Sequence, residues 1–338
     1  MNAWFAFLLC VTVIGIAGAK LSRYGDIIAQ KTGLGGAWVG VALLATATSL
    51  PELAAGVTSV TVANAPNIAV GNVLGSCVFN LLIIVFVDFL YRKQSIYATA
   101  SQGNILSAAF GIMLIGLAGV SIILQSNGAG LSIGHVGAYT PIILMLYAVA
   151  IRTIFLYERS RRDEHVQAAA EPYAAVSLRR AGIGYAIAAA VVVSAGLALP
   201  FVAKSVAKVM GWSEGFVGTV FVAFATCVPE IVATLAALRL GAVDMAISNL
   251  FGSNLFDIVI LAIDDIAYLK GPLLAEVSPM HAASAVSAMI MTGVAIVGLL
   301  YRPVQRVFRT VGWVSIALFT VYLLNISAAY LFSSARTG

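Results

Sequence analysis

Long apolar stretches, separated by short polar segments, run through most of this 338-residue chain. Hydropathy, read together with glycine, proline and charged breakers, predicts ten helices. Most of them are as long as the roughly 20 residues that cross the hydrocarbon layer of a bilayer. The predicted helices cover residues 2–22, 34–62, 67–91, 101–124, 134–157, 181–203, 213–239, 243–268, 280–301 and 308–333. This pattern predicts an all-α polytopic membrane protein with ten transmembrane helices.

The composition excludes several classes of protein. Hydrophobic residues make up 61% of the chain and charged residues 10%, and the mean hydropathy is +1.00, which is far more apolar than a soluble domain. The three cysteines form no CxxC pair, and no HExxH, Walker or nucleophile-elbow motif occurs. We therefore expect the lipid bilayer as the solvent, with no enzymatic activity, no cofactor and no nucleic-acid partner.

Basic residues gather in alternate loops. If the N-terminus faces outward, fifteen of the nineteen Lys and Arg residues fall on the inner side, and only Lys204, Lys208, Lys270 and Arg336 remain outside. Cytoplasmic loops carry an excess of Lys and Arg. We expect a multi-pass protein of a prokaryotic cell (inner) membrane with both termini outside. The polar stretch 159–180 is then a cytoplasmic linker.

Two segments recur on either side of this linker. Residues 47–52 (ATSLPE) reappear as 225–230 (ATCVPE), and residues 71–80 (GNVLGSCVFN) reappear as 248–257 (SNLFGSNLFD). An odd number of predicted helices separates the copies, so the second copy crosses the membrane in the opposite sense. The pattern predicts two inverted five-helix halves, residues 1–158 and 181–338, with repeat cores near 34–91 and 212–268.

Inverted repeats are typical of secondary transporters, which build one central site that can be reached from either side. A cation channel can also be pseudo-symmetric, and it is the main alternative. A receptor or scaffold is a more distant one. The sequence leaves the oligomeric state open and allows a monomer.

Two glutamates are the strongest candidates for a binding site. Glu52 and Glu230 each lie midway along a predicted helix, where a charge costs at least a few kcal/mol. An interhelical ion pair would offset this cost, but every Lys and Arg falls in a loop or at a helix end. A bound cation is therefore favoured.

A proline precedes each glutamate. Pro51 and Pro229 have no N–H, so the carbonyls of Ala47 and Ala225 lose their helical donors and become available to a cation. Side chains three or four residues before the glutamates share their helix face. They are Thr48, Ser49, Thr226 and Cys227. Beside the kink and the carboxylate, we expect the hydroxyls to face the site instead of bonding back to their own helices.

The neighbouring predicted helices add further oxygen ligands. Ser76 and Asn80 are four residues apart and face one way, and Ser253 and Asp257 have the same spacing. With the two carboxylates and the released carbonyls, about six oxygens are available, which suits the usual six to eight of Ca²⁺ better than the largely hydrated Mg²⁺.

These residues together resemble the two alpha-repeats of the sodium/calcium exchanger family, within the calcium/cation antiporter superfamily. The resemblance implies two five-helix inverted halves and exchange of calcium for sodium by alternating access. It also implies Ca²⁺ between Glu52 and Glu230, with the backbone oxygens of Thr48 and Thr226. The implied sodium sites use the glutamates, the carbonyls of Ala47 and Ala225, and the hydroxyls of Ser49, Ser76 and Ser253.

Two positions leave the counter-ion open. Cys227 stands where the family has serine, and sulfur is a poor sodium ligand. Asp257 occurs in the potassium-dependent branch and also in some sodium-only members. The Gly-Asn-x-x-Glu motif of the proton-coupled branch is missing, so proton exchange ranks below sodium. Asp88 and Asp265 also correspond across the repeat, with Asp264 adjacent, and we expect pairing or solvation at helix ends for them rather than ion binding.

Overall fold

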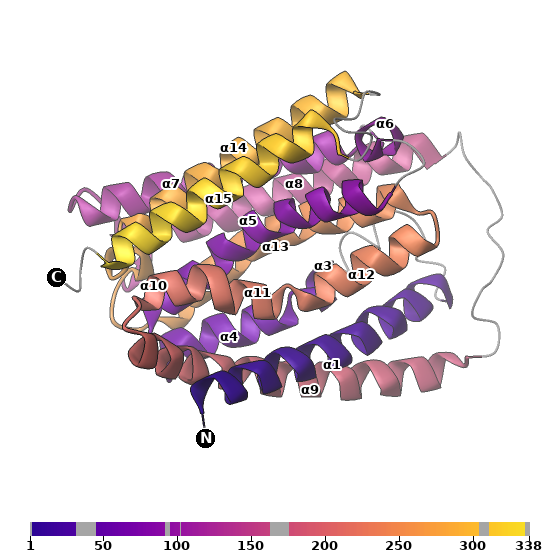
Figure 1. The fold of residues 1–338 in the computed structure, drawn as a ribbon. Coiled ribbons are helices and arrows are strands. Elements are labelled where there is room, and N and C mark those ends of the chain that lie inside the picture. Colours follow the sequence, from indigo (N-terminus) through magenta and orange to yellow (C-terminus); the bar gives the residue numbers. More distant parts are fainter. Residues whose placement is uncertain are drawn as a thin grey trace.

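The computed structural model describes residues 2–31, 45–91, 95–101, 103–162, 176–303 and 311–334. They form a nearly all-helical bundle (Figure 1). The helices before the linker are α1 (Ala3–Lys31), α3 (Ala45–Thr48), α4 (Leu50–Thr61), α5 (Pro66–Leu90), α6 (Ile96–Thr99), α7 (Gly103–Ser126) and α8 (Tyr139–Arg162). Those after it are α9 (Leu178–Met210), α10 (Glu214–Val217), the π-helix η2 (Gly218–Val222), α11 (Ala223–Thr226), α12 (Val228–Arg239), α13 (Val243–Ala267), the 3₁₀ helix η3 (Leu273–Ala275), α14 (Met280–Tyr301) and α15 (Trp313–Ser334).

In the part of the chain that the structure describes, eight helices are long and apolar enough to cross a membrane. A ninth crossing results if residues 214–226 and α12, which meet at a 41° bend, count as one span. The predicted helix 34–62 begins outside the described residues, and its described part is α3 with α4. The described residues therefore contain eight or nine of the ten predicted crossings, and the count of ten stays a prediction.

Three helices differ from their predicted boundaries for physical reasons. Helices α1 and α9 run well beyond the predicted 2–22 and 181–203, because their polar ends remain helical where the apolar pattern stops. The predicted helix 134–157 begins instead with a hairpin, in which β1 (Ser132–Ile133) pairs with β2 (Val136–Gly137). Gly134 in its turn has a φ of 66°, a left-handed conformation that glycine adopts without strain.

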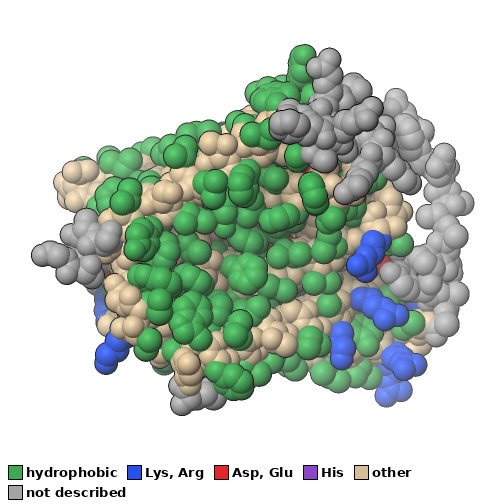
Figure 2. Space-filling model, in the orientation of Figure 1, with side chains coloured by type: hydrophobic (Ala, Val, Ile, Leu, Met, Phe, Trp, Pro, Cys, Tyr) green, Lys and Arg blue, Asp and Glu red, His purple; other side chains and the backbone are tan. Residues whose placement is uncertain are grey.

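The start of α1 and the end of α15 lie at one end of the bundle, and the end of α8 and the start of α9 lie at the other (Figure 1). We call these ends the terminus face and the linker face. Figure 2 shows a broad hydrophobic surface between them, with Lys and Arg side chains mainly at the linker face and a smaller group at the opposite end. An apolar band flanked by charged ends is the surface expected of a membrane-spanning bundle.

Helices α5 and α13 form the centre of the bundle. In the most apolar 18-residue segment of each helix, 78% of the residues are buried in α5 and 89% in α13, whereas 28% are buried in α8 and in α15. Helix α5 packs backbone to backbone on η2, because a Cβ on Gly71 would lie 3.0 Å from the Gly215 carbonyl oxygen, and one on Gly75 would overlap the Thr219 carbonyl oxygen. The glycines of residues 71–80 therefore permit close helix packing.

Candidate cation-binding site

Two helices near the centre of the bundle are interrupted at corresponding residues. The break between α3 and α4 falls at Ser49, and that between α11 and α12 falls at Cys227. The ψ angles of Ser49 and Cys227 are 12° and 0°, which is outside the helical range. The flanking helices match in length, with four residues in α3 and α11 and twelve in α4 and α12.

Prolines explain both breaks. Pro51 and Pro229 lie in the first turn of α4 and α12 and cannot donate a hydrogen bond to the carbonyl four residues earlier. Those carbonyls belong to Ala47 and Ala225, and both residues are buried. They are also among the last carbonyls of α3 and α11, which have no partner within their helix. Both interruptions therefore present backbone oxygens toward the interior.

Glu52 and Glu230 lie in the first turns of the two restarted helices, α4 and α12, and are 1% exposed. The positive end of a helix dipole favours a carboxylate at this position. Ser49 Oγ donates to Glu230 Oε1 at 3.3 Å, so the break of one half contacts the glutamate of the other. Among the described residues, the Oε2 atom of each glutamate has no hydrogen-bond partner. Within the described residues, no Lys or Arg forms an ion pair with either glutamate.

Helices α5 and α13 contribute two fully buried serines, Ser76 and Ser253. Neither hydroxyl oxygen has a hydrogen-bond partner within the described residues. Ser253 and Thr48 lie beside the Glu230 carboxylate, and Ser76 lies beside Cys227. The serines predicted from the sequence are thus brought to the two helix breaks.

Asn80 and Asp257 meet across the α5–α13 interface. Asn80 Nδ2 donates to Asn254 Oδ1 at 3.0 Å and to Asp257 Oδ2 at 3.4 Å. In return, Asn254 Nδ2 donates to the Cys77 carbonyl at 3.2 Å, and Cys77 Sγ lies 3.9 Å from Asp257 Oδ2. Cys77 and Asn254 were not predicted as site residues. The sequence feature that could have identified them is their equivalent position in the two repeats, three residues before Asn80 and Asp257 and on the same helix faces.

The expectation that the threonine hydroxyls leave their own helices is wrong. Thr48 and Thr226 both lie within hydrogen-bond distance, 3.1 Å, of a carbonyl of the preceding turn, which accepts from their hydroxyls. Their backbone oxygens remain candidate ligands. Thr226 Oγ1 also lies 3.0 Å from Asn72 Oδ1, and Asn72 Nδ2 lies 3.5 Å from the Glu52 carbonyl. After Cys77 and Asn254, Asn72 is the third residue beside the helix breaks that was not predicted from the sequence.

Two glycines bring α1 and α9 onto the prolines. A Cβ on Gly18 of α1 would lie 2.8 Å from Pro229 Cβ. A Cβ on Gly196 of α9 would lie 3.0 Å from the Pro51 carbonyl oxygen and 2.8 Å from Ala54 Cβ. Each helix break is therefore covered by a helix of the other half, at a distance that no larger residue permits without a shift.

Asp88 and Asp265 hold the starts of other helices. Asp88 Oδ2 accepts from Gly312 N at 2.9 Å and from Ser315 Oγ at 2.7 Å, at the start of α15. Asp265 accepts four hydrogen bonds, from Gly137 N (2.9 Å), Tyr139 Oη (2.5 Å), Thr140 Oγ1 (2.5 Å) and Leu273 N (2.7 Å). The expected solvation of these two acids is wrong, because both are fully buried. Arg92, the partner expected for Asp88, lies outside the described residues.

The atoms available as ligands at the two helix breaks determine which ions could bind. No group of three or more His, Cys, Asp and Glu side chains that could hold a metal occurs in the described ranges. The ligands would have to be mixed, with carboxylate, hydroxyl, amide and backbone oxygens. Near the two breaks, the oxygen atoms that have no hydrogen-bond partner in the described part of the chain include Glu52 Oε2, Glu230 Oε2, Ser76 Oγ, Ser253 Oγ and Asn80 Oδ1. An all-oxygen set suits hard cations such as Ca²⁺ and Na⁺.

Comparison with known sequences places the chain among membrane proteins. The family model described as sodium/calcium exchanger protein matches residues 2–157 and 181–328. The inner membrane protein YrbG of Escherichia coli (strain K12) is 25% identical over 331 residues, which cover 94% of this chain and 96% of that protein. The uncharacterized membrane protein MJ0091 of Methanocaldococcus jannaschii is 26% identical over 220 residues, or 65% of this chain and 67% of that protein.

Two kinds of solved structure share the fold. The H⁺/Ca²⁺ exchanger CAX superposes with a TM-score of 0.72 at 15% identity, over 99% of this chain and 85% of that one. The sodium-calcium exchanger NCX_Mj superposes with a TM-score of 0.65 at 21% identity, over 97% of this chain and 99% of that one. At these identities the likeness concerns the fold alone.

Proposed function

The chain belongs to the sodium/calcium exchanger protein family, and from the geometry of its two helix breaks we propose that it exchanges calcium for sodium across the membrane by alternating access. Calcium binds between Glu52 and Glu230, with the backbone oxygens of Thr48 and Thr226. The observation that carries this proposal is the pair of buried glutamates at the starts of α4 and α12, each with one carboxylate oxygen that no protein donor contacts. Buried charges are paired or coordinate metals.

Constant spacing between equivalent elements supports two inverted halves, residues 1–158 and 181–338. Helices α3 and α11 start 178 positions apart, as do α4 and α12, while α5 and α13 start 177 positions apart. The interrupted helices also run in opposite directions, since α4 extends toward the terminus face and α12 toward the linker face (Figure 1). By the positive-inside rule, the linker face is cytoplasmic and both termini are outside.

Sodium uses ligands that overlap those of calcium. The hydroxyls of Ser49, Ser76 and Ser253 and the carbonyls of Ala47 and Ala225 are neutral oxygens that complete sodium sites around the glutamates. Two carboxylates balance either one Ca²⁺ or two Na⁺, and an ionised Asp257 adds room for one more monovalent ion. Since the two kinds of ion compete for the same carboxylates, occupancy by one excludes the other. Such competition is what antiport requires.

A cavity supports access from the linker face. It has a volume of about 370 Å³ and lies between α1 and α12. Ala233 and Ala237 line it and lie three and seven residues after Glu230, on the same side of α12. Ser22, Arg23 and Asp26 of α1 form the opposite wall. We infer that ions reach the Glu230 side of the site from the cytoplasm in this conformation.

Calcium flux in proteoliposomes tests the proposal. Vesicles are loaded in turn with sodium, with potassium or at a lower internal pH, and calcium uptake is measured with the membrane potential clamped. We expect saturable uptake that requires an outward sodium gradient. Uptake that requires potassium as well would indicate potassium-dependent exchange, which Asp257 favours, and uptake driven by the pH gradient alone would indicate proton exchange. Calcium entry without any counter-ion gradient would indicate a channel and contradict the proposal.

A further inference from the structure

One buried carboxylate near the site has no counterpart in the repeat. Asp264 of α13 is 0% exposed, and neither of its oxygens has a hydrogen-bond partner within the described residues. Its neighbour Asp265 accepts four hydrogen bonds. A buried polar group without a partner costs about 1–3 kcal/mol, and a charged one costs more. The difference between these two adjacent acids therefore needs a functional explanation.

Asp264 continues the line of site residues along α13. It lies seven residues after Asp257 and eleven after Ser253, so all three share one helix face. At about 1.5 Å per residue, Asp264 is roughly 10 Å from Asp257 along the axis. The direction is toward the terminus face, where α13 ends (Figure 1). Asp264 thus lies between the central site and the outer end of the bundle.

Helix α4 leaves room for this carboxylate. A Cβ on Gly56 would overlap Asp264 Oδ2 and would lie 2.7 Å from Oδ1. Gly56 follows Glu52 by one helical turn. The carboxylate is therefore directed at the α4 backbone, on the side of α4 that carries Glu52. It occupies space that only glycine leaves open.

The other half lacks this arrangement. By the repeat offsets, Val87 of α5 corresponds to Asp264 and Thr234 of α12 corresponds to Gly56. The apolar Val87 can neither bind nor attract a cation. At these equivalent positions of α5 and α13, the carboxylate is therefore present only on the side toward the terminus face, whereas the acid that lines the cavity on the linker side is Asp26 of α1.

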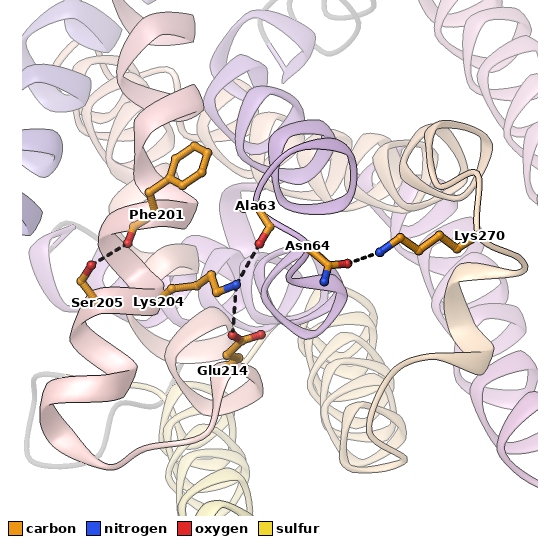
Figure 3. A network of polar contacts seen from close by, with 7 residues as sticks. All are labelled: Ala63, Asn64, Phe201, Lys204, Ser205, Glu214 and Lys270. Atoms are coloured by element: carbon orange, nitrogen blue, oxygen red, sulfur yellow. Dashed lines mark hydrogen bonds and ion pairs between the residues drawn. The ribbon is translucent and has the colours of Figure 1, made fainter.

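The basic residues nearest this end are engaged elsewhere. Figure 3 shows Lys270 Nζ directed at Asn64 Oδ1, 2.6 Å away, and Lys204 Nζ directed at the Ala63 carbonyl (2.8 Å) and Glu214 (3.9 Å). In the described part of the chain, no Lys or Arg forms an ion pair with Asp264. The oxygens of the adjacent Asp265 are instead occupied by four protein donors. A cation that enters between α4 and α13 is the remaining partner.

We propose that Asp264 is a transient binding site for the transported monovalent cation, on the route between the central site and the terminus face. A single carboxylate suits Na⁺ or another monovalent ion, because Ca²⁺ usually takes six to eight oxygens from several ligands. This inference rests on the exchange function proposed above. It adds a step on one side of the membrane that the inverted repeat alone does not provide.

The test measures sodium dependence at one face at a time. Asp264→Asn is reconstituted in a single orientation, verified by protease access to a terminal tag, and sodium-driven calcium exchange is followed with sodium varied at either face at constant pH. We expect the sodium concentration for half-maximal exchange to rise about tenfold at the terminus face, the equivalent of about 1.4 kcal/mol, and to change less than about twofold at the linker face.

Two further variants separate this role from a structural one. Gly56→Ala should displace the carboxylate and give the same one-sided loss, and Gly56→Ala/Asp264→Ala should recover thermal stability without recovering sodium affinity at the terminus face. The matched control is Asp265→Asn, which should lower thermal stability and leave the two faces alike. Equal shifts at both faces, no shift, or a shift that follows pH at constant sodium would overturn the inference. Absence of sodium-driven exchange in the wild type would instead count against the proposed function.

Discussion

The acids of this bundle fall into two regions with equal burial and different surroundings. At the helix ends, Asp88 and Asp265 accept hydrogen bonds from backbone amides and hydroxyls that begin α15 and α8. At the centre, Glu52 and Glu230 each keep one oxygen that no protein donor reaches. All four are at most 1% exposed. Burial alone therefore does not distinguish these acids, and the proposed ion-binding role of the central pair rests on what surrounds each carboxylate.

The largest effect should come from the central pair. Glu52→Gln and Glu230→Gln each remove a carboxylate that no neighbouring group replaces, and we expect calcium exchange to fall by more than about 100-fold, since breaking a buried charge pair costs about 3–5 kcal/mol. The fold should persist, as judged by size-exclusion chromatography and thermal unfolding. Flux similar to that of the wild type in either variant would refute the assigned site.

The helix-end acids should show the opposite behaviour. Asp265→Ala leaves four donors without their acceptor, at about 1–3 kcal/mol for each one that water does not reach, so we expect a clear fall in the thermal unfolding midpoint in detergent. Transport per folded molecule should remain close to that of the wild type. If Asp265→Ala abolished transport without lowering stability, the distinction between the two regions would be wrong.

Asp257 lies between the two classes, because Asn80 donates to it while it also lies near the central site. Asp257→Asn keeps the size of the side chain and removes one possible charge. We expect the variant either to require a different monovalent ion or to move about one charge more or less per turnover. The calcium concentration for half-maximal exchange should change less than about threefold. Reversal potentials in proteoliposomes measure the charge moved. Unaltered ion dependence and charge per turnover would count against this role.

The smallest effect concerns the two break residues themselves. Ser49 donates to Glu230, whereas the corresponding Cys227 is fully buried and offers sulfur, a poor ligand for sodium. Cys227→Ser should lower the sodium concentration for half-maximal exchange by about two- to fivefold and leave calcium affinity unchanged. Ser49→Cys is the matched reverse change and should raise the sodium concentration for half-maximal exchange. If neither variant moves the sodium dependence, these residues only fill space.

The amino-acid sequence predicted the helices well, because apolar length and repeat spacing are local properties of the chain. Glu52 and Glu230 were also identifiable, since each is an acid within an apolar stretch and each follows a proline. Asn72 and Asn254 were not, because a polar residue in an apolar helix has the same pattern whether it joins two helices or faces an ion. The roles of Gly18 and Gly196 depend on which helices become neighbours, and a single sequence does not report that.

The same limit applies to Asp264 and Asp265. Adjacent acids at a helix end have one sequence pattern, yet one faces a glycine on α4 and the other faces the hairpin before α8. The surrounding helices alone determine that Asp265 accepts four hydrogen bonds while Asp264 accepts none from the described residues. Of the two alternatives predicted for the acids at this helix end, pairing or solvation, solvation is wrong for both, because both are fully buried.

The contacts of Gly18 with Pro229 and of Gly196 with Pro51 bear on how such a chain could have arisen and how it can be divided. Each half covers the helix break of the other, so on the proposed function neither half would enclose its ions alone. On the proposed inverted repeat, a duplicated ancestor of half this length would have needed two copies inserted in opposite orientations to complete one site. Residues 1–158 and 181–338, produced as separate polypeptides, should accordingly reconstitute exchange only when both are present in the same membrane.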